Sequence, residues 1–589
     1  MRYVPLLILV ASVSLTGVLC GCGAEPPSTP DSGPGPRDAG PPDAYVEPPL
    51  EPDLVCPGSP GCETGDGALL VGTAALEITP EVTETFQDHD GDGSWDPGDE
   101  PFTDTDGDGE FDGQWIAGFG HARAAADVMN PQWARAIVLR AGDTTLALVA
   151  LDCVGWMIDE IDPTREAIEA AGLDVDYVVV GATHVHQARD TVGIWGPSLG
   201  DTGLDYDYQA FVQRQTLEAV RAALADLRPA NVQYASTLLR DQDTPSDVNR
   251  YVGDNRYPNI IDDEIRILRF VEAGTSDVTM PGSGSTIATL INFASHPEFQ
   301  GSENRSLSSD WPHWMRDAVE NGIPSGPDGT PIDGIGGNAV FFNGAVGAQI
   351  GPNRMHPRTW DGREIDEDSL EGATVVGTQL GSFVLAALRG DGTTLEETAE
   401  IGFRRARFFL PVQNRQYHIA GQQMLFRRQL YHYDETRRID ERSGNIPDVL
   451  TEIAVIDIGA ATMMTAPGEL DPAEFLGGYE APCEFTPGGC EALIDEAQEN
   501  PPDLSMAPSG PFLRDVLLER RPDARQVWCL GLTNDFLGYF IPDFDYELAE
   551  VLPYIGEAPG QHYEETNSVG PLGWPRIRGK IEELVRWTP

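Results

Sequence analysis

Short runs rich in valine, isoleucine and leucine recur along most of the chain, and each ends in a polar loop that contains glycine. Stretches with apolar residues at helical spacing separate several of these runs. Near-continuous apolar strands separated by amphipathic helices are typical of a sheet covered on both faces, so the pattern predicts an α/β fold with a mixed β-sheet core flanked by helices. The predicted strands are 145–151, 177–180, 286–293, 339–342, 453–458 and 526–532, and the predicted helices are 163–171, 208–227, 314–321 and 369–388.

The pattern also indicates how the chain is divided. No linker-like segment and no repeat of solenoid period interrupts residues 68–589, so we predict a single large domain there. Residues 23–67 are rich in Pro, Gly, Ser and Asp and are predicted to form a disordered tether, because they cannot bury enough apolar surface to fold.

The first 22 residues have the layout of a secretory signal: Met1-Arg2, then an apolar run to Leu19, then Cys20-Gly21-Cys22. The end of this run resembles a bacterial lipobox, with Cys22 as the lipidated residue. An ordinary cleaved signal and a single anchor helix are the alternatives. We therefore expect an exported protein, either a lipoprotein anchored in the outer membrane or at the cell surface, or a secreted one.

Composition and charge limit the partners. Hydrophobic residues make up 40% of the chain, which is enough for a packed core. The 38 basic and 95 acidic residues give a net charge of −57, which repels phosphate backbones and anionic lipid headgroups. We therefore expect no nucleic-acid partner.

The cysteines fit an exported protein. Two pairs lie close together in the sequence, so each can form a local disulfide, the alternative being free thiols. Cys153 and Cys529 lie in apolar runs and are predicted to be small buried side chains. The two pairs are Cys56 with Cys62, and Cys483 with Cys490.

Polar side chains follow several of the predicted strands. His184 and His186 follow one strand, His296 follows another, and Glu469 and Tyr539 come after the two C-terminal strands. Open α/β sheets place their sites at the carboxyl ends of strands, so these residues are expected to converge. Imidazoles with a carboxylate are good zinc ligands. A single His after a strand is more often an ordinary loop residue, so the combination carries the hypothesis.

Several short motifs occur between about residues 70 and 589, and their order along the chain is informative. Ala182-Thr183-His184-Val185-His186 matches the Ala-Thr-His-Thr-His run of the neutral/alkaline (non-lysosomal) ceramidase family, and the whole order resembles that family. The other motifs are 71–80, 118–123, 134–139 with 150–152, 249–250, 267–270, 308–310, 467–469, 531–534 and 563–564.

The resemblance implies a zinc-dependent amidohydrolase that cleaves the amide bond of an N-acylsphingosine-like lipid, or a related amide, with a zinc-activated water. His186 is then expected beside that water, where it or a nearby carboxylate exchanges the proton. Arg250 and Tyr563 are expected to contact the substrate carbonyl or the developing oxyanion. The zinc ligands implied by the resemblance are His184, His296, Glu469 and Tyr539.

Residues 343–352 depart from the family pattern. Ceramide-cleaving members carry a Gly-Asp-x-Ser-Pro run there, and this chain has neither the aspartate nor the serine. Two alternatives to a ceramidase therefore stay open: a zinc esterase or amidase for a more polar substrate, and a non-catalytic binding protein that retains the fold. The leading expectation remains an amphiphilic, lipid-like substrate. A helix exposing Met424, Leu425 and Phe426 would receive its acyl chain, although such a stripe is more often core.

An Asp-rich insertion at 85–115 predicts calcium binding. Its first loop matches an EF-hand loop, with acidic side chains at positions 1, 3, 5, 9 and 12, Gly93 at position 6 and a backbone carbonyl at position 7. The second loop has Trp115 where the last acid is expected. We predict a structural calcium clamp, the alternative being a solvated acidic hairpin. The predicted ligands are Asp88, Asp90, Asp92, Ser94, Asp96 and Asp99 in the first loop, and Asp104, Asp106, Asp108 and Asp112 in the second.

Overall fold

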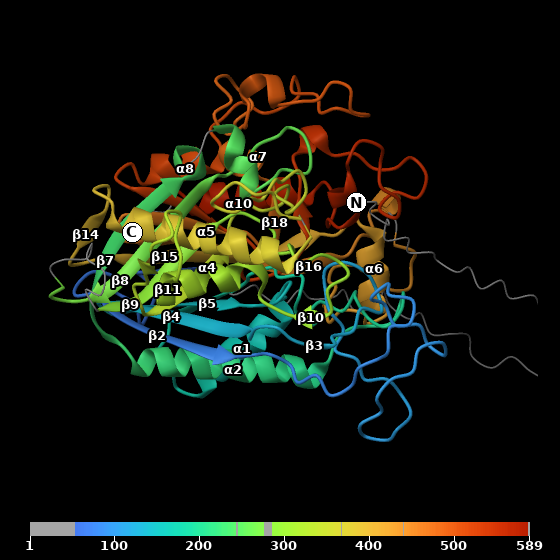
Figure 1. Cartoon of the computed structure of the whole chain (residues 1–589). Coiled ribbons are helices and arrows are strands. Elements are labelled where there is room, and N and C mark those ends of the chain that lie inside the picture. Colours follow the sequence, from blue (N-terminus) through green and yellow to red (C-terminus); the bar gives the residue numbers. More distant parts are fainter. Residues whose placement is uncertain (1–52, 243–244, 276–284, 367, 440, 587–589) are drawn as a thin grey trace, which may run out of the picture.

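The computed structural model describes residues 53–242, 245–275, 285–366, 368–439 and 441–586 (Figure 1). The predicted signal sequence and lipobox (1–22), and the predicted tether up to residue 52, lie outside the described residues.

Nine of the described strands form one mixed sheet. Its order is β13-β9-β8-β7-β2-β4-β5-β6, with β14 beside β7. The pairs β5–β6 and β9–β13 are parallel and the other pairs are antiparallel. The strands are β2 (Leu70–Glu77), β4 (Trp133–Ala141), β5 (Thr144–Leu151), β6 (Tyr177–Ala182), β7 (Arg228–Leu238), β8 (Glu264–Glu272), β9 (Thr286–Phe293), β13 (Asn338–Asn343) and β14 (Thr394–Glu396).

A five-stranded sheet packs against one face of the nine-stranded sheet. Its order is β1-β15-β16-β17-β19, in which only β17 and β19 are parallel. Leu148 and Leu290 of the larger sheet share a buried cluster with Phe403, Ile456 and Trp528 of the smaller one. The strands are β1 (Leu54–Cys56), β15 (Ile401–Pro411), β16 (Asp448–Ile458), β17 (Ala461–Thr465) and β19 (Gln526–Leu530).

Helices cover the two outer faces (Figure 1). On the nine-stranded sheet lie α1 (Ile158–Ala170), α2 (Tyr206–Ala225), α4 (Asp310–Asn321) and α5 (Leu370–Arg389). On the five-stranded sheet lie α7 (Pro472–Leu476), α8 (Leu513–Arg520) and α10 (Gly573–Leu584). The body is therefore one large domain of four layers, two sheets between two layers of helices. The prediction of a mixed sheet flanked by helices is confirmed, but a second sheet covers the inner face of the larger one.

The remaining short elements lie in the connections. They are β3 (Asp127–Val128) paired with β10 (Ser306–Leu307), β11 (Gly322–Ile323) with β12 (Ile332–Asp333), β18 (Glu469–Leu470) with β20 (Tyr539–Phe540), and the helices α3 (Leu239–Gln242), α6 (Arg415–Gln422), α9 (Tyr563–Thr566), η1 (Pro245–Arg250), η2 (Glu441–Ser443), η3 (Gly489–Ala492) and η4 (Asp543–Asp545).

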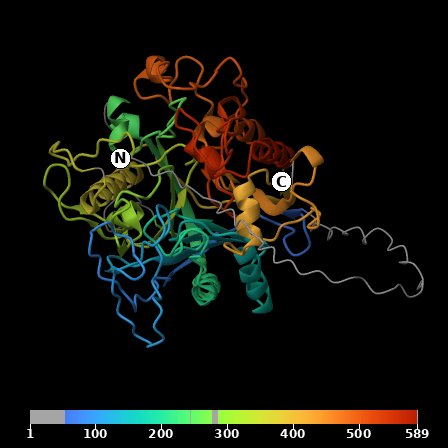
Figure 2. The same cartoon turned by 90° about the vertical axis from the view of Figure 1, so that its right-hand side faces the viewer.

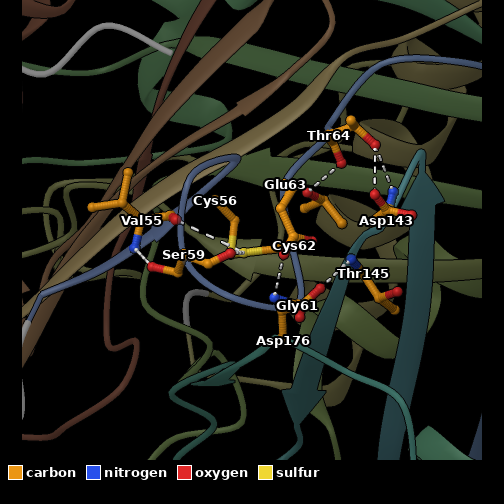
Figure 3. The surroundings of a disulfide bond; sticks show 11 residues. Val55, Cys56, Ser59, Gly61, Cys62, Glu63, Thr64, Asp143, Thr145 and Asp176 are labelled. Atoms are coloured by element: carbon orange, nitrogen blue, oxygen red, sulfur yellow. Dashed lines mark hydrogen bonds between the residues drawn. A yellow bond between two sulfur atoms is a disulfide. The ribbon is translucent and has the colours of Figure 1, made fainter.

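The folded body begins earlier than the predicted tether (23–67) allows, because β1 pairs with β15. Cys56 and Cys62 form a disulfide and are both buried in the core between the sheets. Thr64 donates a hydrogen bond to Asp143 in the turn between β4 and β5 (Figure 3). A short loop closed by a disulfide thus packs on the body despite its Pro- and Gly-rich composition.

The other described cysteines are as predicted from the sequence. Cys483 and Cys490 form the second disulfide, in the connection between α7 and α8. Cys153 and Cys529 are free and buried, as predicted from the apolar runs around them.

Candidate active site

Loops that follow five strands meet in the interior. At the end of β13, the Asn343 side-chain amide nitrogen donates to the carbonyl of Thr183, 3.3 Å away in the loop after β6, and to that of Ser295, 3.1 Å away in the loop after β9. After β19, Thr533 forms an isolated bridge to the end of β6 and donates its N–H to the Ala466 carbonyl after β17. These loops carry the histidines, the glutamate and the tyrosine that the sequence singled out.

Donor atoms from these loops form a tight cluster. One Glu469 carboxylate oxygen lies 3.3 Å from His184 Nε2 and 3.1 Å from His296 Nε2. The Tyr539 hydroxyl lies 3.4 Å from His296 Nε2, and His186 Nε2 lies 3.3 Å from His184 Nε2. Ligand atoms about 2.0–2.1 Å from a tetrahedral zinc ion are about 3.3 Å apart. The spacing and the chemistry of these donors therefore fit a divalent metal such as zinc.

Backbone carbonyls fix the orientation of two of the imidazoles. His184 Nδ1 lies 2.6 Å from the Val154 carbonyl, and His296 Nδ1 lies 3.0 Å from the Gln349 carbonyl. Because a carbonyl only accepts, each Nδ1 carries the proton and each Nε2 presents its lone pair to the cluster. His184 has a positive φ of 69°, a conformation that is costly for a residue other than glycine and is often found at functional sites.

The β18–β20 pair brings the carboxylate and the phenol together, since Glu469 and Tyr539 are register partners in this parallel bridge. Burial alone would raise the pKa of Glu469, but His184 and His296 hold it well below its usual value. Burial raises the pKa of the Tyr539 hydroxyl well above its usual value. Glu469 is thus an anion in a buried site, which favours a cation at its centre.

A further carboxylate, missed in the sequence, lies behind His186. Glu298 is buried, and its carboxylate oxygen lies 3.0 Å from His186 Nδ1. Burial raises the pKa of Glu298 to about 7 and lowers that of His186 well below its usual value. The two groups can therefore share or pass a proton. The only signal in the sequence is that Glu298 follows the His296-Pro297 pair directly.

The structure separates the two residues expected at the substrate carbonyl. Tyr563, the first residue of α9, lines the cavity beside the cluster, with its ring centroid 6.0 Å from that of Tyr539. Arg250, the last residue of η1, lies over the Tyr251 ring and is not among the described residues that line this cavity.

The cluster opens into a cavity, which His184, His186, Glu469 and Tyr539 help to line. The Asp190 carboxylate accepts hydrogen bonds from the backbone N–H groups of Val192, Gly193 and Trp195, and so shapes the loop that forms one wall. Apolar side chains dominate that side of the cavity. They are Val192, Ile194, Trp195, Leu199, Leu425 and Phe536.

The predicted helix over residues 424–426 is wrong. Helix α6 ends at Gln422, and the three apolar residues lie in the turn that follows. Leu425 lines the cavity, Phe426 is buried in the core and Met424 is 57% exposed. The separation arises because successive residues in a turn point in different directions, so one of the three contacts the cavity.

The Asp-rich segment 85–115 lies at the periphery of the fold as a pair of loops (Figure 2). Its carboxylates, together with that of Glu84, form three groups, each compact enough to hold a cation. Trp95, Phe102, Phe111 and Trp115 pack together between the loops and give the segment a small apolar core of its own. The three groups are Asp88 with Asp90 and Glu100, Glu84 with Asp104 and Asp106, and Asp106 with Asp108 and Asp112.

Two glutamates that the sequence did not single out occupy equivalent places in the two loops. In the first loop, Glu100 accepts the N–H groups of His89 and Asp96, whereas Asp99, expected as the last ligand, is exposed. In the second loop, buried Glu84 accepts the N–H groups of Thr105 and Asp112, which hold the same loop positions. Glu84 precedes both loops in the chain, which explains why the second loop appeared to lack its last acid.

No protein-family model matches the chain, and no curated protein matches it. Solved structures do. The neutral ceramidase from Pseudomonas aeruginosa superimposes with a TM-score of 0.56 at 14% identity, over 88% of this chain and 74% of that chain. This chain has the fold of neutral ceramidase. A second structure, a ceramidase complexed with C2, gives a TM-score of 0.55 at 13% identity, over 88% of this chain and 75% of that one. At such identity the likeness establishes the neutral ceramidase fold, and function must be argued from the site.

Proposed function

We propose that this protein is a zinc-dependent hydrolase that cleaves the amide bond of an N-acylsphingosine-like lipid or a related amide. One observation carries the proposal: a buried cluster of imidazole, carboxylate and phenol donors, about 3.3 Å apart, borders a cavity with an apolar wall. The neutral ceramidase fold supports it, because ceramidase is the activity named for the two similar structures.

Each residue of the cluster then has a task. Zinc bound there would polarise the substrate carbonyl and lower the pKa of a water molecule towards neutrality. His186, with Glu298 behind it, would accept a proton from the attacking water and return it to the leaving amine. The residues that would hold the metal are His184, His296, Glu469 and Tyr539.

Tyr563 is placed to donate its hydroxyl proton to the carbonyl oxygen as negative charge develops there. We assign this contact to Tyr563 rather than to Arg250, which lies outside the described cavity lining. The altered run 343–352 still supports the site, because the Gln349 carbonyl accepts from both the backbone N–H and Nδ1 of His296. We therefore expect the change in this run to alter the choice of substrate more than the binding of the metal.

The test is turnover by the purified protein, before and after treatment with a chelator and after addition of zinc. We expect release of amine from ceramide or from simpler N-acyl amides, lost with the chelator and restored by zinc. Turnover restricted to short, polar esters or amides would favour the alternative substrate class. Stoichiometric zinc without turnover of any of these substrates would indicate a binding protein that retains the fold.

We also propose that the Asp-rich segment binds two calcium ions as a structural clamp. The loops supply the carboxylates, and Glu100 and Glu84 complete them. Burial raises the pKa values of Asp96 and Asp112, and repulsion from neighbouring carboxylates raises them further; a bound cation would relieve that repulsion.

Export with lipid attachment at Cys22 is proposed on the sequence alone. An anchor of this kind would hold the cavity near lipid substrates. Replacement of Cys22 with Ser should release the protein from the membrane fraction; retention there would contradict the anchor.

A further inference from the structure

The cavity is also lined by a histidine that is not part of the metal cluster. His121 lines it, and neither ring nitrogen has a hydrogen-bond partner among the residues that the structure describes, although both nitrogens are buried. Buried polar atoms are nearly always hydrogen-bonded, and an unpaired one costs about 1–3 kcal/mol. Because these unpaired nitrogens belong to a side chain that lines a cavity, a ligand that hydrogen-bonds to them is expected.

Hydrogen bonds hold the backbone next to this ring. Ala122 donates its N–H to the Gly196 carbonyl and accepts the N–H of Trp95, at 2.9 and 2.8 Å. The residue after His121 is therefore fixed between the wall loop of the cavity and the Asp-rich segment.

The surroundings define what the ring can bind. Burial lowers the pKa of His121, and nearby Asp201 opposes this effect only in part, so the ring is neutral, with one donor and one acceptor nitrogen. Asp201 also lines the cavity and adds a carboxylate that only accepts. Apolar side chains, including Ile194 and Leu199, line the cavity as well. A hydroxyl group both donates and accepts, and so it complements a neutral imidazole.

We propose that His121, assisted by Asp201, is a specificity-determining subsite that binds a hydroxyl group carried by the substrate apart from its amide. The proposal rests on the proposed amide hydrolysis for its substrate, but the subsite itself requires only the cavity. A site built to pair with a hydroxyl discriminates strongly against the analogue that lacks it, because its own polar groups are then left unpaired.

Matched amides test the subsite. N-dodecanoylethanolamine, N-dodecanoylpropanolamine and N-dodecanoylbutanolamine are each compared with the alkylamide that lacks the hydroxyl. Binding is measured by calorimetry on chelator-treated protein, and turnover by amine release from zinc-loaded protein. For at least one pair, we expect the hydroxyl to improve wild-type binding by about 10-fold or more. His121→Phe should bring that ratio close to one, and Asp201→Asn should reduce it less.

His313→Phe is the matched control, since His313 lies on α4 against Trp314 and outside the cavity lining. It should keep the wild-type ratio. A ratio near one for every pair in the wild-type protein, or a ratio retained by His121→Phe, overturns the subsite, as does failure of every amide to bind. If binding shows the ratio while no amide is hydrolysed, the subsite stands and the proposed hydrolase falls. If His121→Phe melts early, Asp201→Asn and the wild-type ratio still decide the question.

Discussion

The two Asp-rich loops allow a sharp test because one buried glutamate closes each of them. Glu100 and Glu84 each accept two backbone N–H groups from equivalent loop positions. A glutamine in either place keeps one acceptor oxygen, turns an amide group towards the other N–H and removes the negative charge that calcium requires. We therefore expect Glu100→Gln to abolish binding in the first loop alone and Glu84→Gln in the second loop alone.

The magnitude follows from linkage. At a free calcium concentration of about 100 times Kd, one ion bound only by the folded state adds about 2.7 kcal/mol to the free energy of unfolding. Cooperative unfolding of about 530 residues carries an entropy of about 1.1 kcal/mol/K, so each ion raises Tm by about 2.5 °C and the pair by about 5 °C.

The assay is a calorimetric calcium titration of chelator-treated protein, followed by melting with and without calcium. We expect two ions per chain in the wild type, one in either single variant and none in the double variant. The increase in Tm on adding calcium should fall in proportion to the number of ions bound. Glu81→Gln, an exposed position in the same region, is the control and should behave as wild type. Two ions retained by either single variant, or none taken up by the wild type, would refute the reasoning.

Three further outcomes are expected. Tyr563→Phe should lower kcat by about 100-fold with zinc content unchanged, because it removes one donor to the developing oxyanion; an unaltered kcat would exclude that role. Gly118→Ala should lower kcat/KM by about 100-fold, because a Cβ there would collide with the His186 ring and displace it; full activity would show that the position of His186 does not matter. Burial raises the pKa of Glu474 to about 8, so the ionised form is disfavoured in the fold and stability falls as pH rises from about 4.5 to about 8. In melting curves across that range, Glu474→Gln should lack this decline, and parallel pH profiles would contradict the assignment.

Much of the fold could be predicted from the sequence, since six predicted strands coincide with β5, β6, β9, β13, β16 and β19, and four predicted helices with α1, α2, α4 and α5. What the pattern could not reveal is the second sheet. A strand such as β5, buried along its whole length, has the same apolar sequence whether a helix or another sheet covers it. The start of α1 was also missed, because Pro163 suggested the first turn but lies inside the helix.

The candidate site was predictable where chemistry followed a strand directly. His184, His296 and Glu469 come soon after strand ends, and the structure brings them together. Glu298 and Glu84 were not predictable in this way. The Glu298 carboxylate contacts His186, which is far away in the sequence, and Glu84 contacts a loop that begins 20 residues later, at Asp104. Arg250 lies over the Tyr251 ring and outside the described lining of this cavity, so its contact with the substrate stays a prediction.

The measurement that tests the central claim most directly is the zinc content of the purified wild-type protein and of His184→Ala, with circular dichroism to establish that both are folded. We expect about one zinc ion per wild-type chain, bound by the cluster around Glu469, and almost none in the folded variant. Equal zinc in the two folded proteins, or a wild-type protein that binds no zinc when it is supplied, would contradict the account.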